Sequence, residues 1–306
     1  MIKAVIDLGT NTFHLMIASK QDDQLQVHRK LQVPVKLGED GITQGIIQPK
    51  AYQRAIKALA EFNKILTEYK VNETLVFGTS AIRGAQNGQQ FIDEVQKRFH
   101  LKIEAIEGDR EAELIFEGVK HSFTLPHTPC LVMDIGGGSV EFIIGQQDKI
   151  LWKKSYSIGA ARLLAKFNHS EPIKDKEIAA VNDYVAQIIQ DCMVVCNAYK
   201  VNCLIGSAGS FETLRDVLLH DLNAQLHPLS NNACKINKSE FDLFYHLMVT
   251  SNQEQRAALK GMIDFRVDMM VVSAILMKLI VETTEVNEII VSDFALKEGM
   301  FFSKSN

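Results

Sequence analysis

The chain has 306 residues, 46% of them hydrophobic, and a formal net charge of −4. This length allows a substantial buried core and favours about two domains. The negative charge argues against a broad surface for duplex nucleic acid, so an anionic ligand needs local donors. Five cysteines without a Cys-x-x-Cys pair argue against a disulfide framework and favour the reducing cytoplasm. No apolar run is long enough for a bilayer, so we expect no membrane segment.

An internal sequence repeat is the most informative feature of the chain. Residues 4–17 and residues 131–144 both read as an apolar strand, an Asp-x-Gly turn and a second apolar strand. This pattern is typical of a β-hairpin whose turn comes close to another group. Two such hairpins, 127 residues apart by their numbers, predict a duplicated domain.

Strands and helices alternate after each hairpin, which predicts an α/β fold. In the first half we expect a helix at 49–69, a strand at 75–77, a helix at 89–99, a strand at 101–106 and a helix at 109–121 capped by Asp109. In the second half we expect a helix at 175–199, a strand at 203–205, a turn and helix at 206–219, helices between 240 and 280, and a strand at 289–291. Prolines near residues 122–128 mark the predicted boundary between domains 1–124 and 125–306.

Three consecutive glycines follow the strand of the second hairpin. Glycine allows backbone angles that turn successive N–H groups into one concavity, which is a common phosphate-binding arrangement. A tight hairpin without a ligand is the alternative, but the first hairpin has a small, hydroxyl-rich turn at the same place. Together the turns predict a phosphate chain held between two domains, with the ligands Gly9, Thr10, Asn11, Thr12, Gly136, Gly137, Gly138 and Ser139.

Carboxylates flank both turns. Asp7 and Asp134 end buried apolar strands, where a carboxylate is costly unless it is paired or metal-bound, and Glu141 follows the glycine turn. Carboxylates and substrate phosphates together are the usual ligands of Mg²⁺, so these three residues predict a site for Mg²⁺ or another divalent cation. For Glu141 the alternative is an ordinary outward-facing strand residue.

Further candidates lie in strand-to-helix turns and in one helix. Glu111 lies near the start of its predicted helix, where the helix dipole favours the ionised form of a general base; a surface Glu that complements the dipole is the alternative. The turns at 78–83 and 206–210 are rich in small donors, and they add Arg83, Gly209 and Ser210 as phosphate contacts. The weaker candidates for the substrate tail are Arg266 and Lys297, while His14, Cys192 and Cys196 are interpreted as structural.

Six motifs in order resemble the exopolyphosphatase and guanosine pentaphosphate phosphohydrolase family, within the sugar kinase, heat-shock protein 70 and actin superfamily. The motifs lie at residues 7–15, 78–83, 108–119, 134–141, 206–210 and 291–299. The resemblance implies two actin-like (ribonuclease H-like) domains with an interdomain cleft. It also implies that Glu111 orients or deprotonates water, that Asp134 and Glu141 hold the cation, and that Arg83 contacts phosphate.

The chain departs from the family pattern at several positions. Arg110 stands where the family often has a first glutamate, Thr10 and Thr12 replace serines, and Val267 follows Arg266 where alanine is commoner. Longer members carry helical C-terminal domains that extend a polyphosphate channel. We therefore expect weaker binding of very long polyphosphate chains here, unless a homodimer forms such a channel.

The predicted activity is hydrolysis of terminal phosphates from inorganic polyphosphate by attack of water. Guanosine pentaphosphate is the alternative substrate, which needs a guanosine pocket near His14 or Arg266. A kinase of the same superfamily and a non-catalytic nucleotide sensor also remain open, because the fold alone does not decide the function.

Overall fold

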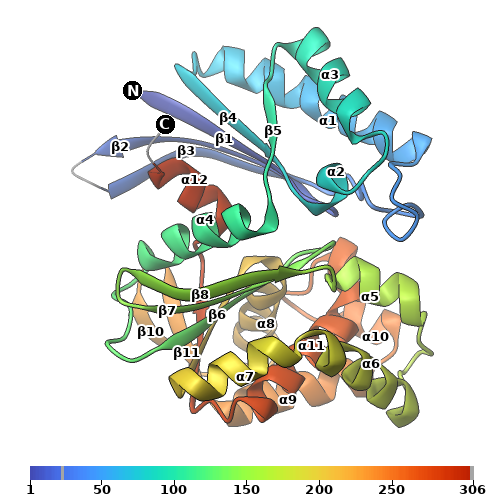
Figure 1. Ribbon diagram of the computed structural model, residues 1–306, viewed down its shortest axis with the longest axis vertical. Helices are drawn as coiled ribbons and strands as arrows, with labels where there is room; N and C mark the ends of the chain where they lie inside the picture. The colour runs from blue at the N-terminus through green and yellow to red at the C-terminus, as the bar shows by residue number, and fades with distance from the viewer. Residues whose placement is uncertain (22–23, 304–306) are drawn as a thin grey trace.

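The computed structural model of the chain describes residues 1–21 and 24–303 and contains two β-sheets stacked in two lobes (Figure 1). The first sheet has the strand order β3-β2-β1-β4-β5, and the second has the order β10-β11-β12-β9-β6-β7-β8. The elements of the first half are β1 (Ile2–Leu8), β2 (Phe13–Gln21), β3 (Gln24–Val33), α1 (Pro49–Glu68), β4 (Glu73–Gly78), α2 (Ser80–Arg83), α3 (Gly88–Phe99), β5 (Ile103–Ala105) and α4 (Gly108–Lys120).

The second half begins with β6 (Cys130–Ile135), β7 (Val140–Gln146), β8 (Lys149–Tyr156), α5 (Ala160–Phe167), α6 (Asp175–Ile188), α7 (Gln190–Tyr199), β9 (Cys203–Ser207) and α8 (Ala208–His220). It continues with β10 (His227–Ser230), β11 (Ala233–Ile236), α9 (Lys238–Thr250), α10 (Gln253–Ala257), the 3₁₀ turn Asp264–Arg266, α11 (Val267–Thr283), β12 (Glu288–Ser292) and α12 (Leu296–Phe302). The proposed domains, 1–124 and 125–306, hold one sheet each. Among the described residues no helix is long and apolar enough to cross a membrane.

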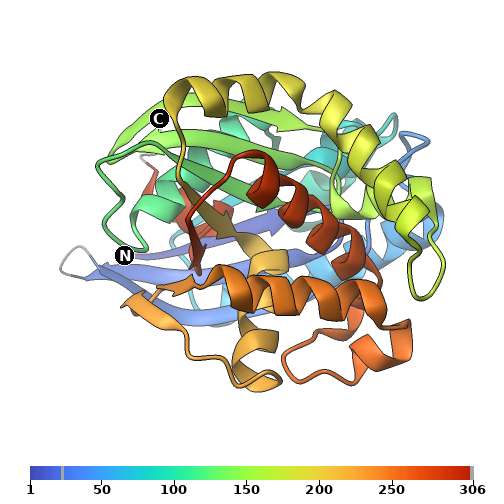
Figure 2. The ribbon, with the colours of Figure 1, turned by 90° about the horizontal axis from the view of Figure 1, so that it is seen from below.

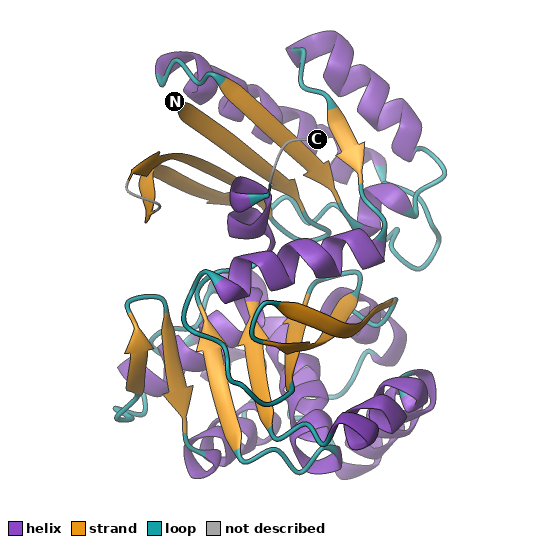
Figure 3. Cartoon of the chain, turned by 60° about the vertical axis from the view of Figure 1, so that its left-hand side comes forward, coloured by secondary structure: helices purple, strands orange, loops and turns teal. Residues whose placement is uncertain are grey.

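Hydrophobic packing arranges these elements in layers. One core joins the first sheet to α1 and α3, and another joins the second sheet to helices that include α6, α7, α8, α9 and α11. Viewed from below, several of these helices cover the outer side of the second lobe (Figure 2). A third core lies between the sheets, where α4 crosses from one side of the molecule to the other (Figure 3). Its members include Val5, Met16, Ile115, Val132, Ile205 and Met300.

The two predicted hairpins are confirmed. β1 pairs antiparallel with β2, and β6 pairs antiparallel with β7 in the same relative register. Asp7 faces His14 across the first hairpin, and Asp134 faces Glu141 across the second. Each first strand also pairs in parallel with a later strand, β4 or β9, so both Asp residues lie near the carboxyl ends of parallel strands.

Most predicted helices and strands are confirmed, with three differences. The helix predicted at 175–199 is divided at Ile189, whose ψ of 14° departs from helical geometry. The strands β3, β8, β10 and β11 and the helix α5 were not predicted; the sequences of β10 and β11 are short and have no strong apolar alternation. The helix predicted to begin at a capping Asp109 begins at Gly108 instead, with Glu107 at the cap and no side-chain capping bond.

Two glycines let the last helix pack closely on the first lobe. Helix α12 contacts α4 and β1, although it follows the last strand of the second sheet. A Cβ atom on Gly299 would lie 1.7 Å from the carbonyl oxygen of Leu114, and one on Gly118 would lie 2.1 Å from that of Ala295. The two helix backbones therefore approach too closely for any side chain at these positions.

We expect Gly299→Ala to lower the free energy of unfolding by roughly 1–3 kcal/mol, because the new methyl group overpacks the α4 contact. The intrinsic helix propensity of Ala is about 1 kcal/mol better than that of Gly, so propensity predicts the opposite sign. Denaturant unfolding measures the difference. Gly84→Ala is the control, since its Cβ would lie 3.2 Å from the nearest oxygen; equal stability of the Gly299→Ala protein and the wild type would contradict the packing.

Candidate active site

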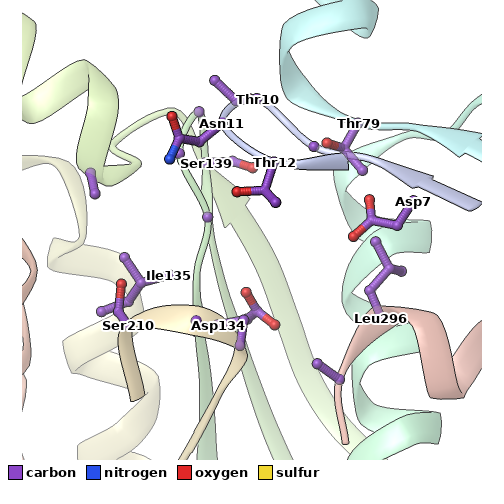
Figure 4. Close-up of a pocket in the computed structure, with 18 of the residues that line it drawn as sticks. Asp7, Thr10, Asn11, Thr12, Thr79, Asp134, Ile135, Ser139, Ser210 and Leu296 are labelled. Atoms are coloured by element: carbon purple, nitrogen blue, oxygen red, sulfur yellow. The ribbon is translucent and has the colours of Figure 1, made fainter. Parts of the chain in front are cut away.

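A cavity of about 130 Å³ lies between the lobes and is lined by residues from both. Figure 4 shows Asp7 and Asp134 reaching this cavity from different elements, with Thr12 above them. The predicted site residues that line it are Asp7, Gly9, Thr10, Asn11, Thr12, Glu111, Asp134, Gly136, Gly137, Gly138, Ser139, Gly209, Ser210 and Arg266. The structure thus brings together segments from the start, the middle and the end of the chain.

The glycine turn of the second hairpin is held from behind by α5. The N–H groups of Ala160 and Ala161 donate to the carbonyl oxygens of Gly136 and Gly137, each at 2.9 Å. Arg162 Nε donates to the carbonyl oxygen of Gly138 at 2.8 Å. In a planar trans peptide the N–H of the next residue points opposite to the carbonyl. The N–H groups that follow these three carbonyls therefore point away from α5, as a phosphate-binding turn requires.

The turn of the first hairpin is held in the same way by the segment after β3. The N–H of Lys36 donates to the carbonyl oxygen of Asn11 at 2.7 Å, and that of Gly38 donates to Thr10 at 2.9 Å. The same peptide geometry turns the N–H groups of Asn11 and Thr12 away from this segment. The two turns lie against each other, since a Cβ atom on Gly137 would be 3.1 Å from Cβ of Thr10.

Four carboxylates gather beside these turns: Glu111, Asp134 and Glu141 are buried, and Asp7 is half-buried. Ser207 Oγ donates to Asp134 at 2.9 Å, and Ser155 Oγ donates to Glu141 at 2.7 Å. By contrast, Oδ1 of Asp7 is buried and has no hydrogen-bond partner among the described residues. Glu141, which pairs with Asp134 across the hairpin, is 1% exposed and does not line the cavity, so its predicted contact with a cation stays a prediction.

Burial raises the pKa values of the carboxylates. Burial raises the pKa of Asp7 to about 7 and that of Asp134 to about 6. The pKa of Glu141 rises to about 7, through burial and the nearby charge of Asp134. Burial and the charge of Glu141 also raise the pKa of Glu111 well above its ordinary value. The helix dipole was expected to favour the ionised form of Glu111, whereas burial and a like charge shift its pKa in the opposite direction.

Arg83 holds Glu111 in place. Arg83 Nη1 donates to Oε2 of Glu111 at 3.2 Å and to the carbonyl oxygen of Ile106 at 2.6 Å. Arg83 itself does not line the cavity, although α2 starts there with Ser80. The predicted direct contact of Arg83 with phosphate therefore remains a prediction, while its contact with the candidate base is observed.

A second cation, Lys297 of α12, lines the cavity and is partly buried. Although burial disfavours its charge, Glu298 and Glu212 raise the pKa of Lys297 to about 12. Burial and the charge of Lys297 lower the pKa of His14 to about 3, so its ring is neutral near pH 7. His14, interpreted from sequence as structural, lines the cavity together with Thr79 and Ser80 of the predicted donor-rich turn 78–83. Glu212, which sequence reasoning did not select, lines it too. For His14 the available signal was its position opposite Asp7 in the hairpin.

The carboxylates fit a bound divalent cation. Within residues 1–21 and 24–303, no group of three or more His, Cys, Asp or Glu side chains has the arrangement of a complete metal site. Mg²⁺ does not need one, since it usually keeps several waters and uses one or two carboxylates with substrate phosphates. The unpartnered Oδ1 of Asp7 and the raised pKa values both indicate buried negative charge that a cation would neutralise.

The comparison with known proteins agrees with this arrangement. Residues 16–306 match the Ppx/GppA phosphatase family. The chain belongs to this family. An exopolyphosphatase from Cytophaga hutchinsonii has a similar structure, with a TM-score of 0.95 and 35% identity over 99% of this chain and 97% of that one. The expected α/β fold, with two sheets and a cleft between the lobes that hold them, is confirmed.

Two curated relatives of this Ppx/GppA family member are much longer than the chain. A bifunctional 3-dehydroquinate synthase/phosphatase from Fusobacterium nucleatum is 32% identical over 95% of this chain and 45% of the relative. A guanosine-5′-triphosphate,3′-diphosphate pyrophosphatase from Photobacterium profundum is 27% identical over 71% of this chain and 43% of the relative. The chain thus spans less than half of each of these two proteins.

The raised pKa of Asp7 predicts a pH-dependent stability in the absence of metal. The folded protein holds a proton on Asp7 up to about pH 7, whereas an unfolded Asp has its ordinary value near 3.8, so stability falls as pH rises from about 4 to about 7. Asp7→Asn removes this loss. We expect it to stabilise the chelator-treated protein at pH 8 by about 1 kcal/mol or more, with a smaller gain at pH 5.

Denaturant unfolding at both pH values measures this effect. The exposed Asp148 provides the matched control, and Asp148→Asn should change the stability little at either pH. A destabilising effect of Asp7→Asn at pH 8 would contradict the assignment of a buried, uncompensated carboxylate.

Proposed function

We propose that this Ppx/GppA family member hydrolyses the terminal phosphoanhydride bond of inorganic polyphosphate. The observation that carries the proposal is the pair of hairpin turns whose N–H groups point away from their supporting segments, next to the buried Glu111. Backbone donors held in this way bind phosphate without a large positive surface. The names of the similar proteins support the same class of reaction.

In the proposed reaction, the turns hold the terminal phosphoryl group while a water molecule attacks its phosphorus in line with the bridging oxygen. Glu111 orients this water and accepts its proton, and the bond between phosphorus and the bridging oxygen breaks. Its raised pKa makes the carboxylate a stronger base toward the proton of water. Arg83 keeps Glu111 directed at the water.

The cation is proposed to be Mg²⁺, held by Asp134 and Asp7 with Glu141 behind them. When bound, it supplies charge stabilisation for the phosphoryl oxygens and the leaving group. We also propose that Ser139, Gly209 and Ser210 contact phosphates and that Arg266 contacts the rest of the substrate. Arg266 lies at the cavity edge, where its Nη1 is 3.1 Å from the hydroxyl of Thr213.

Hydrolysis of guanosine pentaphosphate is the second candidate, and an adjoining cavity favours it. This cavity, of about 560 Å³, shares Thr10, Asn11 and Met269 with the active-site cavity and also includes Phe265. Its volume is in the range of small-molecule sites. A nucleoside would fit beside a phosphate chain held by the turns.

We assign the chain to the cytoplasm, because all five cysteines are free thiols, which suits a reducing compartment. A homodimer stays a prediction.

We expect Glu111→Gln to lower turnover by about 10²-fold or more, because the amide cannot accept the proton of water. Binding should change little, since Gln keeps the size of the side chain. Phosphate release with Mg²⁺ from short polyphosphate, long polyphosphate and guanosine pentaphosphate measures the effect. Glu113→Gln, on the same helix but paired with Lys153 and Arg110, is the control and should keep near-normal activity.

The substrate with the largest Glu111-dependent release identifies the main activity. Turnover of the Glu111→Gln protein within a few-fold of wild type would overturn the role of this residue. Phosphoryl transfer from ATP to an acceptor, or tight binding without any release, would replace the hydrolase by a kinase or a sensor.

The proposed cation site predicts that Mg²⁺ stabilises the folded protein. At a concentration of 100 times the dissociation constant, the expected stabilisation is about 2.7 kcal/mol. Asp134→Asn should remove most of this gain, whereas Asp148→Asn should keep it. Thermal unfolding with and without Mg²⁺ measures both variants, and an equal gain in the Asp134→Asn protein would contradict the site.

A further inference from the structure

Arg162 of α5 connects two parts of the active site that belong to different lobes. Its Nε donates to the carbonyl oxygen of Gly138, in the turn of the second hairpin, at 2.8 Å. Its Nη1 donates to the carbonyl oxygen of Ile42, in the segment between β3 and α1, at 2.8 Å. The Arg162 side chain is half-buried. It lies 24 residues from Gly138 and 120 residues from Ile42 in the sequence.

Both carbonyl partners belong to the supports of the phosphate-binding turns. Ile42 follows the segment 36–38, whose N–H groups hold the carbonyls of Thr10 and Asn11. The N–H of Ile42 also donates to the carbonyl oxygen of Gly38 at 2.9 Å, so Ile42 is joined directly to this support. One guanidinium therefore links the support of the first turn to the backbone of the second.

In the second turn, the carbonyl oxygens of three successive peptides accept hydrogen bonds, and Arg162 is the donor for the third of them. The N-terminus of α5 supplies N–H donors for the carbonyls of Gly136 and Gly137, but the donor for Gly138 is the side chain of Arg162. The carbonyl of Gly138 and the N–H of Ser139 belong to the same planar peptide group and point in opposite directions. The orientation of the Ser139 N–H thus depends on a side chain, whereas the two before it depend on a helix.

We propose that Arg162 is a positioning residue that orients the Ser139 N–H and sets the spacing of the two phosphate-binding turns. The inference rests on the proposed function, since it requires phosphate to bind at these turns. Arg162 acts through the backbone and does not need to touch the substrate. Its geometry, rather than its charge alone, carries the role.

The fork of the guanidinium is what makes this link possible. Nε and Nη1 point in different directions from one rigid plane, so they reach carbonyls of two separate segments. A lysine ammonium is a compact point charge on a flexible chain and lacks this fixed fork. Arg162→Lys therefore keeps the positive charge but loses the geometry.

The test measures binding of tripolyphosphate by calorimetry, in the Glu111→Gln background so that turnover is slow during the measurement. We expect Arg162→Ala to weaken binding by roughly tenfold or more, the value of a hydrogen bond to a charged group. Arg162→Lys should recover less than half of this loss on a logarithmic scale. Lys166→Ala removes an exposed positive charge from the same helix and should bind like the background protein.

Amide hydrogen exchange gives a readout independent of substrate. Peptides that cover residues 36–45 and 136–139 should exchange faster in the Arg162→Ala protein, while peptides from α9 keep their protection. If Arg162→Ala does not fold, the comparison of Arg162→Lys with Lys166→Ala carries the test alone.

Binding of tripolyphosphate by Arg162→Ala as tight as that of the background, or full recovery by Arg162→Lys, would overturn the positioning role. These results differ from a failure of the proposed function, in which the Glu111→Gln protein itself does not bind tripolyphosphate. Weak binding by Arg162→Ala with unchanged exchange at both segments would also overturn it, because the effect would then be one of charge.

Discussion

Excess negative charge in a buried cleft is the constraint on which the active site depends. Glu111, Asp134 and Glu141 are buried and Asp7 is half-buried, and burial raises the pKa of each. Without another cation the raised pKa values mean that these carboxylates keep their protons to higher pH than usual, and Asp7 keeps an unsatisfied oxygen. The arrangement is costly for stability and suited to a metal ion and a reaction that moves a proton.

The same cleft offers the complementary surface for phosphate. Two hairpin turns present backbone N–H groups because their carbonyls are occupied from behind by segment 36–38, by α5 and by Arg162. This is how the proposed polyanion would be held although the chain carries a net charge of −4. Carboxylates for a cation and amides for an anion, side by side, are the parts that phosphoryl transfer requires.

The position of α12 completes the site from the end of the chain. This helix packs against α4 through Gly118 and Gly299, and it brings Lys297 into the cleft. Glu298, the next residue, is fully buried and accepts hydrogen bonds from Lys30 and from the N–H of Ala295. The close helix contact therefore positions a charged pair beside Asp7, which ties the stability of the fold to the electrostatics of the site.

The sequence by itself determined the repeated hairpins, most helices and the residues that meet in the cleft, because these follow from local periodicity and from short motifs such as 134–141. Only the tertiary structure decided the start of α4 at Gly108, the raised pKa of Glu111 and the place of His14 in the cavity. It also revealed the link made by Arg162. Burial, like charges and hydrogen bonds between distant segments set these properties, and none of them leaves a local pattern in the sequence.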